Sequence, residues 1–225
     1  RHQAALLQIS GPLGRFGLKV ANDRHRDDLI ILAQADPPHT GGGARVEHPH
    51  IGRREADRAA RICDQHDIIV VSGLAKGIDT IAHQTAINSG GQTIAVLGTP
   101  LNVSYPKENA NLLEMIKKEH LAVSQFPEGY PTQPKNFPIR NRTMALISDA
   151  TIIIEASEKS GTRHQGWEAL RLGREVYILE NVIKEKEISW AKEMLDYGAQ
   201  VLSRDNVDEI FTDIPYLTSK FEGAF

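Results

Sequence analysis

Residues 68–79 read Ile68-Ile69-Val70-Val71-Ser72-Gly73-Leu74-Ala75-Lys76-Gly77-Ile78-Asp79. The first four are apolar and β-branched, so they predict a strand that is covered by helices on both faces. The glycines that follow predict a tight turn, and the apolar spacing after it predicts a helix at about residues 78–88. A buried strand, a turn and a helix in this order are the repeating unit of a parallel sheet.

The same unit recurs along the chain. Strands are predicted at residues 68–72, 93–97, 122–125, 151–155, 175–179 and, more weakly, 200–202. Helices are predicted at about 53–66 and 78–88, around 112–116, and around 139–147, where Ile139, Leu146 and Ile147 are expected to share the buried face. The pattern predicts an α/β fold with a doubly wound, mostly parallel sheet and helices on both faces.

Length and composition predict one large domain. The chain has 225 residues and is 40% hydrophobic, which suits one large core. We predict an irregular N-terminal extension at residues 1–50, although Leu29-Ile30-Ile31-Leu32 could form a strand. A core domain is predicted at residues 51–214 and a C-terminal tail at 215–225.

The charge and the single cysteine narrow the class of protein. A formal charge of −3 argues against broad nonspecific binding to polyanions, so any nucleic-acid site must be a local basic patch. Cys63 excludes an internal disulfide framework and favours a reducing compartment. Since no apolar run approaches about 18 residues and no signal-peptide pattern opens the chain, a cytoplasmic location without membrane contact is predicted.

An unusual helix start follows the third predicted strand. Residues 135–142 read Lys135-Asn136-Phe137-Pro138-Ile139-Arg140-Asn141-Arg142. Cations are disfavoured at a helix N-terminus, so the cluster suggests that an anion such as phosphate binds there, with the Phe137 ring available to stack on a base. Arg140 and Arg142 should point to different sides of the helix, one toward a ligand and one bracing the loop. A merely solvated cationic surface is the alternative.

Two further loops join this one at the carboxyl edge of the predicted sheet. The first contains Ser72, Gly73, Lys76 and Gly77, and the second contains Ser160, Gly161, Thr162 and Arg163. Both combine small residues with a cation before a helix, as in phosphate sites. Structural alternatives remain open: a tight turn in which Asp79 caps the helix and pairs with His83, and a simple capped turn at Ser160–Thr162.

Metal and nucleophile chemistry is not predicted. His39, His48 and His50 lie in the irregular segment without a cysteine partner or a clear carboxylate, so an incidental role is favoured and no metal is expected. No serine or cysteine nucleophile has a recognisable base arrangement.

Three segments resemble the DprA/Smf family of DNA-processing proteins. They are Val70–Asp79, Thr93–Gly98 with Tyr105-Pro106-Lys107-Glu108-Asn109, and Asn136–Arg142. The resemblance implies an extended Rossmann-like fold, binding of single-stranded DNA, a homodimer, and loading of a RecA-type recombinase in recombination or natural transformation. It implies no catalytic role and no cofactor. The helical N-terminal and winged-helix C-terminal domains of many members are not expected here.

The resemblance also assigns residues. Ser72, Gly73, Lys76 and Gly77 would line the pocket, and Lys135, Phe137, Arg140 and Arg142 would contact phosphates and bases. The family has a Gly-Ser-Arg whose arginine contacts DNA; here the region reads Gly43-Ala44-Arg45, so Arg45 is the candidate for that role.

Two other functions remain open. LOG-type phosphoribohydrolases share the wider fold, and Gly161-Thr162 matches the core of their Gly-Gly-x-Gly-Thr-x-x-Glu loop, but Gln165 stands where the catalytic Glu is needed. Glu168 on the next turn keeps the enzyme alternative open. The third possibility is a sensor that binds a nucleotide signal in the same pocket. We predict a binding protein and not an enzyme.

Overall fold

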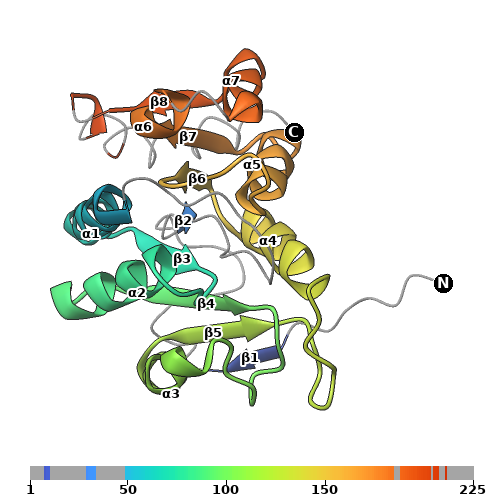
Figure 1. The fold of residues 1–225 in the computed structure, drawn as a ribbon. Helices are drawn as coiled ribbons and strands as arrows, with labels where there is room; N and C mark the ends of the chain where they lie inside the picture. Colours follow the sequence, from blue (N-terminus) through green and yellow to red (C-terminus); the bar gives the residue numbers. More distant parts are fainter. Residues whose placement is uncertain are drawn as a thin grey trace, which may run out of the picture.

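One twisted sheet organises the computed structural model (Figure 1), which describes residues 8–10, 29–33, 49–184, 188–203, 205–207 and 211, with side chains from residue 51 onward. The strand order in the sheet is β1-β5-β4-β3-β2-β6-β7-β8. The strands are β1 (Gln8–Ser10), β2 (Leu29–Ala33), β3 (Ile69–Ser72), β4 (Thr93–Leu97), β5 (Leu121–Ser124), β6 (Ala150–Ile153), β7 (Glu175–Leu179) and β8 (Gln200–Leu202). The helices are α1 (Pro49–Gln65), α2 (Ile78–Ser89), η2 (Lys107–Asn109), α3 (Ala110–Glu119), α4 (Asn136–Ile147), α5 (Thr162–Arg171), α6 (Glu180–Lys184) and α7 (Ser189–Asp196).

The chain winds outward from β2 in both directions. It passes through β3 and β4 to β5, then crosses back through α4 to add β6, β7 and β8 on the other side of β2. These neighbours are parallel, and β1 pairs antiparallel with β5 at the edge. The winding direction therefore reverses between β2 and β6, the point where doubly wound sheets bind ligands at their carboxyl ends. The predicted fold class is confirmed.

Helices cover both faces of the sheet. Figure 1 shows α1, α2 and α3 on one face and α4 and α5 on the other. On the α4 face, Val71 and Val96 pack with Met144 of α4, whereas Leu97 packs with Leu113 and Ile116 on the α3 face. Strand residues buried on both faces explain why their runs are continuously apolar.

The prediction of an irregular N-terminal extension needs correction. Within residues 1–50, the structure places β1 at an edge and β2 at the centre of the sheet, where Ile31 pairs with Thr151 of β6. A short apolar run has no periodicity that could identify it as a central strand. Helix α1 also begins at Pro49, a residue suited to the first helical turn. The C-terminal tail at 215–225 lies outside the described residues, so the division into domains stays a prediction.

The predicted buried face of α4 is wrong for two of its three residues, whereas Ile147 packs against the core as predicted. Ile139 and Leu146 are 41% and 49% exposed, whereas Asn136, Arg140 and Asn141 are buried. The side-chain donors of these three residues find acceptors at the carboxyl edge, which offsets the cost of burying them. This inversion of α4 shapes the site.

No helix among the described residues is long and apolar enough to cross a membrane.

Candidate nucleic-acid interface

The loop between β3 and α2 is closed by side chains rather than left open for a ligand. The Asp79 Oδ2 atom accepts hydrogen bonds from the backbone N–H groups of Gly73 (3.1 Å) and Ala75 (3.0 Å). From the η2 turn, Asn109 Nδ2 donates to the Leu74 carbonyl at 2.9 Å. The structural interpretation of this turn is therefore favoured, with one correction: Asp79 binds N–H groups of the loop that precedes the helix. The N–H groups of Gly73 and Ala75 are thus not available to an anion.

Lys76 extends from this loop into solvent. Its Nζ atom lies 3.3 Å from Glu108 Oε1, and both side chains are exposed. The pKa of Glu108 is lowered by a hydrogen bond from its own backbone N–H and by Lys76. Ser72 is fully buried at the end of β3, and Gly77, at φ 103°, precedes α2 in a conformation that favours glycine. Of the four residues predicted in this loop, Lys76 is the one whose charged group reaches solvent.

Arg140 is a buried brace. Only 3% of it is exposed. Its Nη1 donates to the carbonyls of Gly73 and, at 3.5 Å, Val96, and its Nε donates to Asn141 Oδ1 at 2.7 Å. A Cβ atom at position 73 would overlap the guanidinium, so the close approach requires glycine there. The spacing argument correctly separated the two arginines, and Arg140 is the one that braces the loop.

The two amides of α4 extend the brace to the neighbouring loops. Asn136 Nδ2 donates to the carbonyls of Gly98 (3.1 Å) and Pro131 (3.0 Å). Asn141 Nδ2 donates to the Gly161 carbonyl at 3.4 Å. Helix α4 thus contacts the loops after β3 and β6, the two that were predicted to converge with its own N-terminus, and also the loop after β4. Asn136 and Asn141 therefore hold loops together and are themselves buried.

The backbone N–H groups in the first turns of α4 and α5 already donate hydrogen bonds to acceptors within the protein. At α4, the N–H groups of Asn136 and Phe137 bond to the carbonyls of Gln133 and Pro134, and Pro138 has no N–H. At α5, the Thr162 N–H bonds to Ser160 Oγ at 3.0 Å and the Arg163 N–H to the Ser160 carbonyl. The capped-turn interpretation of Ser160–Thr162 is therefore confirmed, and both residues are buried. The first-turn N–H groups of α4 and α5 are therefore not available to an anion, and the exposed cations beside them are the remaining candidates at these two helices.

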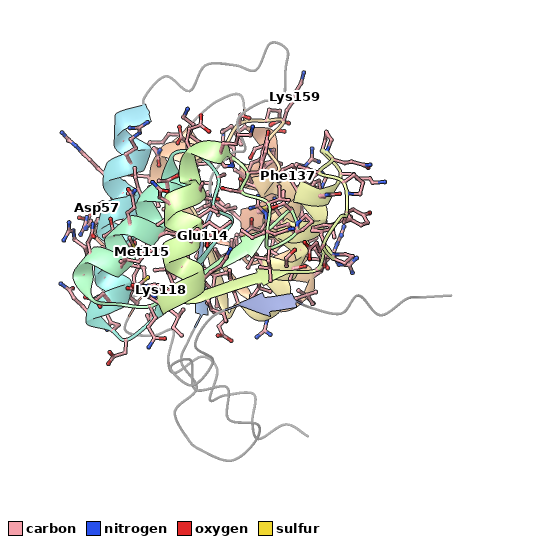
Figure 2. The ribbon with its side chains drawn as sticks, turned by 90° about the horizontal axis from the view of Figure 1, so that it is seen from below. Asp57, Glu114, Met115, Lys118, Phe137 and Lys159 are labelled. Atoms are coloured by element: carbon pink, nitrogen blue, oxygen red, sulfur yellow. The ribbon has the colours of Figure 1, made fainter. Side chains whose placement is uncertain are left out.

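An exposed rim surrounds the braced loops. It consists of the cations Lys76, Lys107, Lys135, Arg142, Lys159 and Arg163. The Phe137 ring is half-buried, and a Cβ atom on Gly98 would lie 2.8 Å from it. Figure 2 shows Phe137 and Lys159 at one end of the molecule and Asp57 and Met115 at the other. Exposed cations thus occur on several loops at the carboxyl edge, and two of them, Lys76 and Arg142, form ion pairs with Glu108 and Glu168.

Sequence reasoning missed two cations of this rim, Lys107 and Lys159, and the aromatic ring of Tyr105 beside it. Tyr105 is 42% exposed, and its ring centroid lies 5.3 Å from that of Phe137. Tyr105 and Lys107 lie in the Tyr105–Asn109 segment that carries the family resemblance, where an aromatic ring close to a lysine was the available signal.

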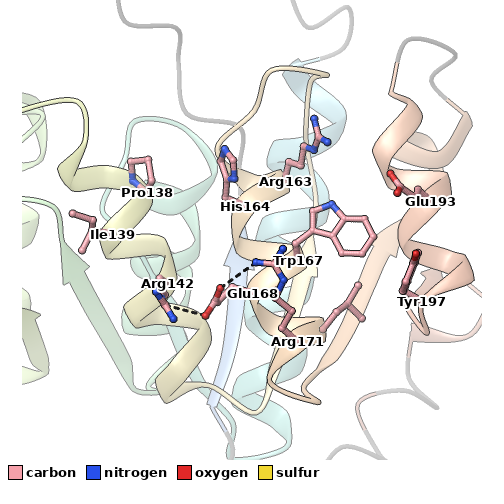
Figure 3. A pocket seen from close by; sticks show the side chains of 11 residues that line it. Pro138, Ile139, Arg142, Arg163, His164, Trp167, Glu168, Arg171, Glu193 and Tyr197 are labelled. Carbon is pink, nitrogen blue, oxygen red and sulfur yellow. Dashed lines mark ion pairs between the residues drawn. The ribbon is translucent and has the colours of Figure 1, made fainter. Parts of the chain in front are cut away.

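A groove of about 920 Å³ opens on one side of the rim, between α4, α5 and α7 (Figure 3). Arg142 and Arg163 both line it, and rings of Trp167 and Tyr197 meet edge to face at 5.2 Å. Glu168, proposed above for the enzyme alternative, lies 2.9 Å from Arg142 and 3.9 Å from Arg171. It is engaged in ion pairs within the groove, which disfavours a role as a general base.

The remaining predicted residues are inert or lie outside the described structure. The His83 ring is fully buried, and burial, with the nearby charges of His120 and Arg140, lowers its pKa to about 3. Since Thr93 Oγ1 donates to the Val70 carbonyl, His83 Nδ1 must donate to Thr93 (2.6 Å), so the predicted pair with Asp79 is wrong. Burial also raises the pKa of the Cys63 thiol. Arg45, His39 and His48 lie outside the described residues, as does the side chain of His50.

Metal ligands do not gather in the part of the chain whose side chains are described. No group of three or more His, Cys, Asp or Glu residues there could hold an ion.

Comparison with known proteins decides the family. Residues 43–215 match the family model of the DNA recombination-mediator protein A. The chain belongs to this family. The DNA processing protein DprA of Streptococcus pneumoniae is 37% identical over 139 residues, which cover 62% of this chain and 49% of that protein. The names of the relatives describe DNA processing, and the family description names a recombination mediator.

Solved structures show the same fold. The X-ray structure of the S. pneumoniae protein superposes with a TM-score of 0.70 at 28% identity and covers 89% of this chain and 64% of that one. A structure of Helicobacter pylori DNA processing protein A, concerned with its single-stranded DNA binding mode, has a TM-score of 0.73 at 21% identity, covering 95% of this chain and 87% of that one. This chain spans about half or less of the length of its first curated relatives.

Proposed function

We propose that this chain binds single-stranded DNA through the exposed rim at the carboxyl edge of its sheet. The observation that carries the proposal is the arrangement of Lys76, Lys107 and Lys135 beside two aromatic rings, on loops that α4 holds in place. Cations that follow a phosphate backbone and rings that stack on bases are the two components of sequence-tolerant single-strand binding. Family membership and the binding mode described for the H. pylori protein support the same conclusion.

Family membership is also the basis for a proposed cellular role. We propose that the protein acts in the cytoplasm as a homodimer that helps to load a RecA-type recombinase onto single-stranded DNA, in recombination or natural transformation. The description of the family as recombination mediators supports this role.

A salt titration tests the binding. Fluorescence anisotropy with a labelled oligothymidine should show an affinity that falls steeply between about 50 and 200 mM salt, because each neutralised phosphate releases counterions. Lys135→Ala should weaken binding and reduce the slope of log K against log salt by about 0.7, the value for one contact to a single strand. Lys118→Ala is the matched control, an exposed lysine on α3 away from the rim.

Two outcomes would reject the proposal. One is the absence of salt-dependent binding to the oligomer. The other is a mononucleotide that binds as tightly as the oligomer, which would favour a nucleotide sensor in the same fold.

A further inference from the structure

The ring of Tyr105 lies at the outer surface of the rim, over Phe137. Their centroids are 5.3 Å apart and the rings are inclined at 46°. Phe137 is held from other directions as well, because its ring approaches the backbone at Gly98 and the Arg140 guanidinium lies 5.7 Å from its centroid. Phe137 is thus half-buried among neighbours, whereas 42% of Tyr105 faces solvent.

The segment that carries Tyr105 is anchored at both ends. Before it, the buried Thr99 Oγ1 donates to the Val103 carbonyl at 2.7 Å. After it, Asn109 is buried and donates to the Leu74 carbonyl of the β3–α2 loop. A ring on an anchored segment, supported by a second ring, loses little conformational entropy when a ligand stacks on it.

Cations lie on both flanks of this ring pair. Lys107 is two residues beyond Tyr105, and Lys135 is two residues before Phe137. Lys76 is drawn toward the same segment by its ion pair with Glu108. Phosphates on either side of a base stacked at Tyr105 would therefore meet positive charge.

We propose that a DNA base stacks on the ring of Tyr105. The half-buried ring of Phe137 packs against Tyr105 on the side toward the protein and holds it in place. The inference rests on the proposed binding of single-stranded DNA and identifies the residue on which a base lies. It changes the earlier expectation, in which Phe137 itself was the stacking ring.

Substitutions at position 105 separate stacking from packing. In anisotropy titrations with oligothymidine, Tyr105→Leu should weaken binding about 5- to 150-fold, since leucine fills similar space but offers no ring face, and one stacked base contributes about 1–3 kcal/mol. Tyr105→Phe should bind within about twofold of the wild type, because stacking needs the ring and not the hydroxyl. Met115→Ala, which removes an exposed apolar side chain from α3 at the end of the molecule away from the rim, is the matched control and should leave affinity unchanged.

A photocrosslink gives a second measurement that does not depend on affinity. An oligonucleotide containing 5-iododeoxyuridine should crosslink to the peptide that contains Tyr105, and mass spectrometry should locate the adduct on that residue. Wild-type affinity for Tyr105→Leu, or a crosslink on Phe137 in its place, would overturn the inference while leaving DNA binding intact. Failure of the wild-type protein to bind the oligomer would instead reject the proposed function itself.

Discussion

The N-terminal part of α4 has two sides, and the polar residues on one side are buried whereas those on the other are exposed. On the inner side, Asn136, Arg140 and Asn141 are buried and bond to the loops after β4, β3 and β6. On the outer side, Lys135 and Arg142 are exposed. Both sets come from the same eight residues, 135–142. One cationic motif thus divides into buried side chains that hold loops together and exposed side chains that lie on the rim.

The difference has a simple electrostatic basis. A buried guanidinium is tolerated when its donors meet acceptors, and Arg140 has two backbone carbonyls and an amide oxygen. Arg142 is on a solvated face, where its charge is screened and its ion pair with Glu168 contributes little to stability. The inner set should therefore control folding, and the outer set should control ligand binding.

Arg140→Ala should have the largest effect. It leaves the Gly73 and Val96 carbonyls and the Asn141 amide oxygen without this donor, and it opens a cavity among three loops. Hydrogen bonds to charged groups contribute about 1.5–3 kcal/mol each and are not additive, so we expect the free energy of unfolding to fall by about 3–5 kcal/mol. Urea denaturation followed by circular dichroism measures the change.

The matched control is Arg142→Ala, two residues along the same helix. It should change the free energy of unfolding by less than about 1 kcal/mol. Similar losses for both variants would remove the distinction between the inner and outer sides.

Gly73→Ala should have an intermediate effect. A Cβ atom there would overlap the Arg140 guanidinium, so the loop or the arginine must move, at a cost of about 1–3 kcal/mol. The double variant Gly73→Ala/Arg140→Ala should be less destabilised than the sum of the single variants, because the methyl group then has room. Additive losses in urea denaturation would show that glycine is needed at position 73 for a reason other than the approach of Arg140.

The sequence predicted the sheet well because its strands are buried on both faces. The run Thr151-Ile152-Ile153-Ile154 needs no partner information to be recognised as a strand, and β6 lies within one residue of the predicted start. β2 was harder to place, since Leu29–Ala33 is equally apolar but lies among residues without the strand–turn–helix rhythm. Its central position depends on pairing with β3 and β6, which are distant in sequence.

The sequence predicted which residues gather at the candidate site, but not which of their side chains are buried. Spacing separated Arg140 from Arg142, yet only the carbonyls of Gly73 and Val96 determine which of them is buried. Hydrophobic periodicity placed Ile139 inward because it assumes that apolar residues face the core. In α4, carbonyl groups at the sheet edge accept hydrogen bonds from polar side chains, so polar residues are buried where apolar ones were expected. These carbonyl groups belong to loops that are distant in the sequence, so their positions cannot be inferred from the sequence alone.

Glu108→Gln should give the smallest effect, and it tests the outer side alone. The substitution removes a negative charge from the rim and frees Lys76, whose Nζ now lies 3.3 Å from the carboxylate. We expect binding of oligothymidine at low salt to tighten by about twofold to fivefold, and the salt dependence to become steeper because Lys76 can then contact a phosphate. Glu114→Gln is a matched control, since Glu114 forms an exposed ion pair with Lys117 on α3, away from the rim. Equal affinities for the two variants would mean that Lys76 does not face the DNA, and the rim would then have to be redrawn around Lys107 and Lys135.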